Sequence, residues 1–556
     1  MRKLAINHKD FLLLTGIILL QIVVIMYFGV HKTWLFGDEQ WTFNLANHYY
    51  EPFLGDASRY YNQWLTSDFW NKALTVQPKY AFNYNSVFYN QAQDVHPPLY
   101  YVIIHTICSF LPNVFSKWFG LIPNIIFFVI TQVALYRTGL LLFKKAGIAL
   151  VTCFLYGFSW GIVNNTVYIR MYVLWALWGM LSYYFHLRLL KAFSNKLLVL
   201  SLLVSLCGIL TQYYFLIFQF FLSGGYAIYQ LFQKRYKRFF IYCIGYICVL
   251  CAAIAIFPAS IYQITGKVGN QGQAAFNNLA SSSFGNRLST FVHITSMDIF
   301  GGHIRWVMET LVVVFVISVL LKFCHIGIAL KRNPQMDIHV DIHFYRSRFE
   351  FNIVFDYVKI SILYTLFVAT AYFTVVAKIA PYLESRYLVI VYPMVVILFI
   401  ALLQFLGRLD HWSQKCIYLM IILLTVFSSG NTYRMRNLFG YDPKYSSMME
   451  IINQDYHSDI AFIIISKGKT FWPVINEVTT MANADYSLLL SEEDLDNLKS
   501  YLDSYSKNHN AFLVYYGNMN EQDSKNMEKI ISENTEYKNF KIVDFYMGNI
   551  YLFTKM

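Results

Sequence analysis

Charged residues are scarce in this sequence. Lys, Arg, Asp and Glu make up 14% of the 556 residues, and 57% are hydrophobic, whereas average soluble domains carry roughly 25% charged residues. This deficit points to a membrane protein. The polar segments contain no cysteine, since all eight cysteines lie in or beside apolar stretches, and this excludes a disulfide-stapled secreted protein. The sequence has no glycine period and no sustained charged heptad, which excludes collagen-like and coiled-coil proteins.

The charges are distributed unevenly along the chain. Residues 1–440 contain 34 Lys and Arg against 15 Asp and Glu, and residues 441–556 contain 10 against 17. The first part is therefore basic and the tail is acidic. Because the basic residues cluster between apolar runs, where Lys and Arg orient a protein in the bilayer, nucleic acid is not an expected partner.

Long apolar runs predict the membrane spans. Residues 11–30 follow Arg2, Lys3 and Lys9 and are long enough for the roughly 30 Å hydrocarbon core. No cleavage site follows this run, so we expect an uncleaved first span with its N-terminus inside. Ten further spans are predicted, at residues 119–142, 148–165, 171–190, 197–214, 215–232, 239–258, 306–323, 358–377, 387–406 and 416–430.

The number of spans depends on residues 97–117. The run 97–111 is apolar but short for a crossing, and a half-penetrating helix or a true span would both fit it. We therefore expect 11 spans and accept 12 or 13.

The predicted fold is a polytopic α-helical membrane protein with a C-terminal soluble α/β domain. The membrane domain covers residues 1–440 and has a long first outer loop at 31–96; the soluble domain covers 441–556. If the loop is outside, four basic clusters lie inside, as the positive-inside rule requires: Lys144/Lys145, Lys191/Lys196, Lys234/Arg235/Lys237/Arg238 and Lys331/Arg332/Arg346/Arg348. The soluble domain then lies outside.

Short apolar strands alternate with amphipathic helices in the tail, which is typical of a small α/β sheet domain. Strands are expected at 460–466, 486–490, 511–516, 541–547 and 550–554, and helices at 471–482, 492–505 and 521–533. No glycine-rich phosphate loop opens any of these helices. The tail is therefore expected to be a binding or structural module without nucleotide chemistry.

Both ends of the first outer loop carry candidate catalytic groups. Asp38 and Glu39 follow the first span, and Asp94 and His96 precede the re-entry at Pro97. A carboxylate near the interface can accept a proton from a hydroxyl or hold a divalent ion. Two simpler interpretations stay open: the first pair could be solvated loop charges or a helix N-terminal pair, and Asp94 could cap the next helix.

Arg170 and Arg386 lie at outer ends of predicted spans, each beside tyrosines. An Arg at a span end is usually a snorkelling anchor. On the outer side, however, it opposes the positive-inside bias, so both are candidates for an anionic ligand such as phosphate. Tyr172, Tyr213 and Tyr387 are the substrate-binding tyrosines expected at the same level.

Four motifs in this order resemble the GT-C membrane glycosyltransferases. They are Asp-Glu after the first span, Asp-Val-His-Pro-Pro-Leu-Tyr-Tyr at 94–101, Arg-Met-Tyr at 170–172, and Arg-Tyr at 386–387 followed by Tyr-Pro at 392–393. The chain is most similar to the bacterial branch of polyprenyl-phosphate-sugar-dependent protein mannosyltransferases and aminoarabinose transferases. The resemblance covers roughly residues 1–410 and not the tail.

The resemblance implies a function as well as a fold. It implies an inverting transfer of one sugar from a polyprenyl-phosphate donor to an acceptor hydroxyl, at the outer face of the cytoplasmic membrane of a bacterium. Asp38 would be the general base with Glu39 beside it, and Asp94 and His96 would position the acceptor or an ion. The two basic elements, at Arg170 and Arg386, would stabilise the leaving phosphate.

Several points stay open at the level of sequence. A lipid or glycan transporter or flippase is an alternative, although it would call for ionisable residues in mid-span or for broken repeated helices. A non-catalytic cell-envelope assembly protein is another alternative. The sugar, the acceptor (glycan, protein or lipid), the oligomeric state and the use of a divalent cation are not determined. In the inner loop, His339, Asp341 and His343 would share one face of a strand, although a fourth metal ligand is not evident.

Overall fold

A computed structural model describes most of the chain, and it divides into two compact units. The described residues are 7–32, 34–52, 57–267, 271–281, 283–302, 327–332, 338–344, 347–349, 356–409, 414–435, 460–469, 472–506, 511–517, 521–545 and 548–555. The helical unit comprises Met1–Ile25, Asn124–Thr166 and Met171–Met435. The loop–tail unit comprises Met26–Pro123, Val167–Arg170 and Arg436–Met556.

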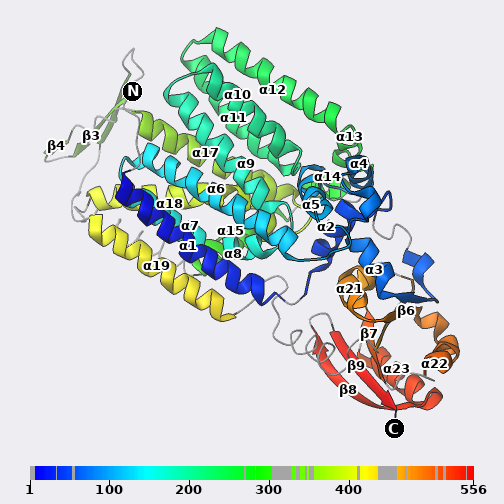
Figure 1. The fold of residues 1–556 in the computed structure, drawn as a ribbon. Coiled ribbons are helices and arrows are strands. Elements are labelled where there is room, and N and C mark those ends of the chain that lie inside the picture. The colour runs from blue at the N-terminus through cyan, green and yellow to red at the C-terminus, as the bar shows by residue number, and fades with distance from the viewer. Residues whose placement is uncertain are drawn as a thin grey trace. The chain divides into compact units, whose positions relative to one another are not determined.

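The helical unit is built almost entirely from helices, many of which run side by side (Figure 1). The α-helices that lie wholly or mostly in it are α1 (His8–Val30), α6 (Trp118–Phe143), α7 (Ala146–Phe158), α8 (Trp160–Val167), α9 (Tyr172–Lys191), α10 (Asn195–Ile209), α11 (Tyr214–Phe232), α12 (Tyr236–Ile256), α13 (Ser260–Ile264), α14 (Gln271–Ala280), α15 (Phe284–Phe300), α17 (Tyr357–Ile379), α18 (Tyr392–Leu409) and α19 (Gln414–Met435). Two short 3-10 turns, η3 (Ser385–Tyr387) and η4 (Val389–Val391), precede α18.

Within the part of the chain that the structure describes, five helices are long and apolar enough to cross a membrane, namely α1, α6, α11, α12 and α17. A sixth is added if α7 and α8, which are bent by 57° at their break, form one span. Helices α10, α18 and α19 contain apolar segments that are shorter. Each predicted span that the structure describes contains an α-helix, with three departures: the span at 148–165 breaks at Ser159, the span at 197–214 leaves its helix after Ile209, and the span at 387–406 begins with 3-10 turns. The predicted span 306–323 lies outside the described residues. The chain is thus a multi-pass helical membrane protein, and the total of 11 spans stays a prediction.

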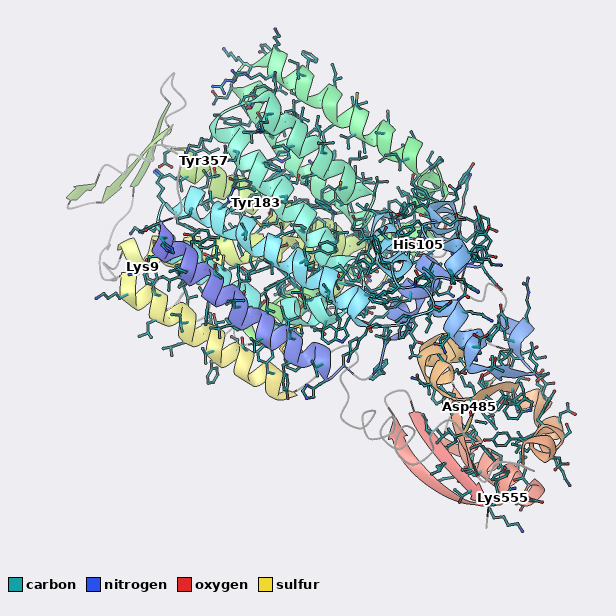
Figure 2. The ribbon with its side chains drawn as sticks, viewed as in Figure 1. Lys9, His105, Tyr183, Tyr357, Asp485 and Lys555 are labelled. Atoms are coloured by element: carbon teal, nitrogen blue, oxygen red, sulfur yellow. The ribbon has the colours of Figure 1, made fainter. Side chains whose placement is uncertain are left out.

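Buried polar side chains tie the helices of this unit together. The Gln132 amide donates to Gln21 Oε1 at 2.9 Å, and the Gln21 amide donates to the Cys153 carbonyl at 3.0 Å. Tyr183, labelled in Figure 2, is hydrogen-bonded to Thr365 through the two hydroxyls. Because the hydrocarbon core offers no water, such groups must find partners within the protein, and these contacts fix the order of the helices.

The loop–tail unit combines the first outer loop with the tail. The loop and the segment that follows it contribute α2 (Gly37–Asn47), η1 (Ala57–Tyr60), β1 (Trp64–Thr66), α3 (Ser67–Leu74), η2 (Pro78–Tyr80), α4 (Tyr84–Gln93) and, after the loop, α5 (Leu99–Ser109). The tail contributes β5 (Ala461–Ser466), α21 (Trp472–Asn483), β6 (Tyr486–Ser491), η5 (Glu492–Asn497), α22 (Leu498–Ser506), β7 (Ala511–Gly517), α23 (Glu521–Asn534), β8 (Tyr537–Phe545) and β9 (Gly548–Lys555).

The tail folds as the predicted alternation of strands and helices. Its strands form a sheet in the order β1-β6-β5-β7-β9-β8, in which β5 pairs in parallel with β6 and β7. Two details differ from the prediction. The helix expected at 492–505 begins as the 3-10 turn η5 before it becomes α22, and β8 begins at Tyr537 rather than at 541. The fully buried strand β5 lies between β6 and β7, which explains its continuous apolar sequence.

The edge strand β1 belongs to the first outer loop and not to the tail. Trp64, Leu65 and Thr66 pair antiparallel with β6, and the Ser67 amide donates to the carbonyl of Asp485, which Figure 2 labels. Because one hydrogen-bonded sheet cannot lie on both sides of a bilayer, the first outer loop and the tail must share a membrane face. The boundary of the predicted soluble domain at 441 stays a prediction, but its sheet takes one strand from the loop.

Helix α5 is too short to cross a membrane, and it docks on the loop. The Phe82 amide donates to Ser109 Oγ at 2.9 Å, and the Asn113 amide donates to the Val76 carbonyl at 2.9 Å. At the middle of α5, His105 Nδ1 lies 2.8 Å from the Ala46 carbonyl of α2 (Figure 2). Contacts at its middle and at its C-terminal end therefore keep α5 with the loop, and the position of residues 97–111 in the membrane stays a prediction.

Candidate functional site

Asp38 lies in the first turn of α2. The Asp38–Glu39 pair is therefore a helix N-terminal pair, which was one of the two simpler interpretations. The helix begins at Gly37, and Tyr168 donates its hydroxyl to Asp38 Oδ2 at 2.8 Å. The Asp38 residue is half-buried. Exposed backbone N–H groups and the positive end of the helix dipole favour a negative charge at this position. The site thus holds a carboxylate with one oxygen fixed by a phenol.

Arg170 lies in the turn between α8 and α9 and contacts three groups of the outer loop. Its Nη1 donates to the Asp38 carbonyl at 3.0 Å, to Thr42 Oγ1 at 3.1 Å and to the Tyr101 hydroxyl at 3.1 Å. These partners belong to α2 and α5, so one buried guanidinium joins two helices of the loop. Its contacts are not those of a snorkelling anchor, because only 4% of the residue is exposed.

Glu39 points into the protein interior beside Asp38. Its Oε2 accepts from Lys32 Nζ and from the Phe36 amide, both at 2.8 Å, and its Oε1 accepts from the Ile169 amide at 2.7 Å. Burial raises the pKa of Glu39, and Lys32 opposes that shift. Since both oxygens are engaged, this geometry suits an anchor of α2 better than a second base. The predicted catalytic role of Glu39 stays a prediction.

Asp94 and His96 form a buried pair at the end of α4. His96 Nδ1 lies 2.9 Å from Asp94 Oδ2, and about 7–8% of each residue is exposed. Because a carboxylate only accepts hydrogen bonds, the pair fixes the ring proton on Nδ1 and leaves Nε2 as the acceptor of a neutral ring. Asp94 does not cap α5, whose first turn follows Pro98, so the capping interpretation does not hold.

These groups interact electrostatically within the loop–tail unit. Burial lowers the pKa of His96; Asp94 opposes this shift, Arg170 adds to it, and Asp38 opposes it. The imidazole is therefore close enough to sense both Arg170 and Asp38. The fold brings together four of the predicted site residues, from the start of α2, the end of α4 and the turn before α9.

The remaining predicted residues lie in the helical unit. The Arg386 guanidinium is over the rings of Tyr382 and Tyr387, 5.5 and 5.7 Å from their centroids, and its Nε is 2.8 Å from Glu384 Oε2. The Tyr387 ring packs against that of Tyr214 at 4.9 Å. Two tyrosine rings and the Glu384 carboxylate thus hold Arg386 at η3. Because the guanidinium contacts the rings through its face, its N–H donors at the edge can still reach an anion.

Tyr172 and Tyr213 are placed differently with respect to Arg386. Tyr172 is buried and is close enough to Tyr387 to interact electrostatically with it. Tyr213 instead donates its hydroxyl to Gln263 Oε1 on α13. Tyr172 therefore belongs to the Arg386 cluster, whereas the described contacts of Tyr213 tie α11 to α13.

Sequence reasoning missed several residues of these clusters. Tyr101 and Tyr168 lie inside the quoted motifs, but nothing in the motifs shows that their hydroxyls meet Arg170 and Asp38. Lys32 was not singled out at all, although its charge directly after an apolar span was a signal. Asp298, the one acid of α15, was also missed.

No group of three or more His, Cys, Asp or Glu side chains positioned to hold a metal ion is found among the described residues. Asp38, Asp94 and His96 remain the candidates for any cation at the outer loop. In the inner loop, residues 338–344 do form a strand, β3 (Ile338–Phe344), between β2 (Gly327–Arg332) and β4 (Ser347–Phe349). Residues 339, 341 and 343 therefore share a face, and metal binding there stays a prediction.

Comparison with known proteins finds a likeness among solved structures alone. The sequence matches no protein-family model and no curated protein. Among solved structures, the chain is similar to ArnT from Cupriavidus metallidurans bound to undecaprenyl phosphate, with 10% identity, a TM-score of 0.42, and coverage of 97% of this chain and 98% of that chain. At this identity and TM-score the likeness assigns neither a substrate nor a reaction to this chain.

Proposed function

We propose that the chain is an inverting membrane glycosyltransferase. It would move a sugar from a polyprenyl-phosphate donor to an acceptor hydroxyl at the outer face of a bacterial cytoplasmic membrane. The observation that carries the proposal is the setting of Asp38: a half-buried carboxylate whose Oδ2 accepts from Tyr168, next to the Arg170 guanidinium and within electrostatic range of His96.

The chemistry needs one base and a stabilised leaving group. A hydroxyl is a poor nucleophile at neutral pH, and the Asp38 carboxylate would take its proton as the oxygen attacks the anomeric carbon. The bond between that carbon and the phosphate oxygen breaks in the same displacement, so the configuration inverts and polyprenyl phosphate leaves with the bond's electron pair. Arg386 would bind the negative charge that develops on the phosphate.

The buried Asp94–His96 pair would position the acceptor. With its proton fixed on Nδ1, a neutral His96 offers Nε2 as an acceptor for a second hydroxyl of the substrate. The lipid chain of the donor would lie in the bilayer beside the spanning helices.

The test is turnover by the purified protein. A panel of polyprenyl-phosphate sugars with candidate acceptors is incubated in nanodiscs; release of polyprenyl phosphate is measured, and the product's anomeric configuration is determined by NMR. We expect Asp38→Asn to lower turnover by about two to four orders of magnitude, as for loss of one general base. The matched control is Asp68→Asn, which changes an exposed acid of the same loop. Movement of intact lipid-linked sugar between leaflets without cleavage would instead assign a flippase.

A further inference from the structure

Asp298 is a buried acid that the reaction described above does not use. It lies near the C-terminal end of α15 and is 7% exposed. Its backbone position is tightly matched to α8, since a Cβ at Gly161 would come within 2.5 Å of Asp298 Cβ. Only glycine at position 161 leaves space for this side chain.

The Asp298 carboxylate gathers hydroxyls from two other elements. Tyr392 at the start of α18 donates to its Oδ2, and the Ser385 hydroxyl of η3 donates to it as well. The side-chain amide of Asn165 on α8 donates to Ser385 Oγ at 3.5 Å. The Ser385 hydroxyl thus accepts from Asn165 while it donates to Asp298. Both partners of the carboxylate are donors, which suits a group that can only accept.

These contacts fix the turn that carries Arg386. Ser385 directly precedes Arg386 in η3, and the other end of the turn is held by the Tyr372 hydroxyl, which donates to the Tyr387 carbonyl at 2.7 Å. The guanidinium then rests over the rings of Tyr382 and Tyr387. Releasing Ser385 would therefore free one of the two fixed ends of the turn.

Keeping a carboxylate here is costly to the fold. Burial raises the pKa of Asp298 to about 7, and the Tyr392 and Ser385 hydroxyls only partly oppose the shift. Other titratable groups stand on α15 and on the elements packed against it: Glu384 and Arg386 on each side of Ser385, Arg287 and His293 on α15, Tyr372 and Lys378 on α17, and Tyr433 on α19. The causes of the Asp298 shift are burial and its two hydroxyl partners, and none of these charged groups is among them. Helix α8 presents Gly161 and Asn165. An amide of the same size would avoid the cost of a buried charge.

From this geometry we propose that Asp298 is a positioning residue, which fixes the Ser385–Tyr387 turn so that Arg386 presents its guanidinium to the phosphate of the lipid-linked donor. The role rests on the proposed function, since it concerns the same donor. This role differs from a purely structural one in its prediction for Asp298→Asn: the variant should be more stable than the parent and yet bind the donor less well.

The stability of Asp298→Asn distinguishes a positioning role from a purely structural one. Between the ordinary pKa of a carboxyl and about 7, the folded protein keeps the Asp298 proton while the unfolded chain has lost it, so stability falls as the pH rises through this window. At pH 8 the charge is present and its full cost applies. Asp298→Asn should therefore raise the melting temperature at pH 8, whereas a residue needed only for folding would lower it.

Donor affinity is measured in an Asp38→Asn background, so that no turnover consumes the ligand. The probe is a polyprenyl-phosphate sugar, whose phosphodiester does not titrate near pH 7. We expect Asp298→Asn to weaken binding roughly two- to tenfold, the loss expected for one hydrogen bond. Affinity should rise from pH 6 to pH 8 in the parent and stay flat in the variant. The matched control is Asp356→Asn, which keeps a helix cap on α17.

A double-mutant cycle decides whether Asp298 acts through Arg386. Once Arg386→Ala has removed the guanidinium, Asp298→Asn should have no further effect on affinity. Additive losses, unchanged affinity in Asp298→Asn, or a lower melting temperature together with weaker binding would each overturn the inference. If the parent protein binds no polyprenyl-phosphate sugar at all, the proposed function has failed instead.

Discussion

Arg170 donates a hydrogen bond from Nη1 to the backbone carbonyl of Asp38 at 3.0 Å. The guanidinium thus fixes the peptide of the proposed base and not its carboxylate, whose Oδ2 accepts from Tyr168. Because the same nitrogen also donates to Thr42 and Tyr101, a movement of Arg170 would alter its contacts with both α2 and α5.

Arg170→Lys is expected to lower kcat/KM by a factor of about ten to a hundred. An ammonium keeps the charge but not the planar geometry that meets three acceptors, and loss of hydrogen bonds to a charged group costs about 1.5–3 kcal/mol. Steady-state kinetics checks this. The control is Arg188→Lys, in an arginine whose Nη1 bonds only to Tyr184 among its described hydrogen bonds. Equal kinetics for the two variants would mean that the hydrogen bonds of Arg170 hold the fold but do not contribute to turnover.

The buried ion pair of Lys32 and Glu39 predicts an asymmetry in stability. Glu39→Gln or Lys32→Met alone leaves one buried charge without its partner and should lower the free energy of unfolding by about 3–5 kcal/mol. The double variant should recover much of the loss. Thermal unfolding in detergent measures this, with Lys72→Met, from an exposed pair on α3, as the control. A double variant as unstable as the sum of the single ones would contradict the pairing.

His96 predicts a loss of stability in acid. Burial lowers its pKa below the ordinary value of 6.5, so as the pH falls through 6.5 the unfolded chain binds a proton before the folded protein does, and stability decreases. Melting temperatures between pH 5 and 8 should fall towards acid, and less steeply in His96→Gln. The slope that remains would come from His48 and His105, whose pKa values burial also lowers, and would be opposed by Asp298, whose raised pKa favours the folded protein in acid. An unchanged slope in the variant would show that folding does not change the pKa of His96.

Local sequence patterns predicted most of the fold. The tail strands and helices follow from short apolar segments between amphipathic ones, and the spans follow from the length of the apolar runs. Strand β1 could not be found in this way. It has only three residues and gains its pairing from β6, more than four hundred residues further along the chain. Such a strand exists because of its partner and not because of its own pattern.

In the candidate site, too, some residues could be found from the sequence and others only from the structure. Asp38, Asp94 and His96 could be singled out because charged groups beside an apolar span are rare and conspicuous. The structure adds what spacing cannot give: Glu39 faces Lys32 while its neighbour Asp38 is half-exposed, because adjacent residues of a helix point about 100° apart. Asp298 was visible only as a lone acid in α15, and its importance depends on hydroxyls from α18 and η3.

The pairing of β1 with β6 makes a prediction about topology. We expect cysteines placed at Lys72 in the loop and at Lys499 in the tail to react with a membrane-impermeant maleimide in intact spheroplasts. A cysteine at Lys237, in a basic cluster predicted to be inside, should react only after lysis. Reaction at Lys72 and not at Lys499 would contradict the shared sheet. Reaction at Lys237 alone would keep the sheet but place the site on the opposite face.

Gln40 links the tail to the helix of the proposed base. Its Oε1 accepts from the Thr479 amide of α21 at 2.8 Å, and its own amide donates to the Leu35 carbonyl at 2.8 Å. A buried side chain that bonds on both sides transmits any shift of α21 to the first turn of α2, where Asp38 lies. Gln40→Ala is therefore expected to lower kcat severalfold, with a smaller effect on the affinity for the donor.

The control for Gln40 is Gln63→Ala, an exposed glutamine of the same loop whose amide bonds only within that loop among its described contacts. Trp70→Phe tests the same link further away, because its Nε1 donates to Ser487 Oγ on β6 at 2.6 Å and the whole side chain is buried. If the tail acts on α2 through α3 and α21, both Gln40→Ala and Trp70→Phe should slow turnover while Gln63→Ala does not. Wild-type kinetics in both variants would show that the tail only covers the loop, since loss of either contact would then leave the position of Asp38 unchanged.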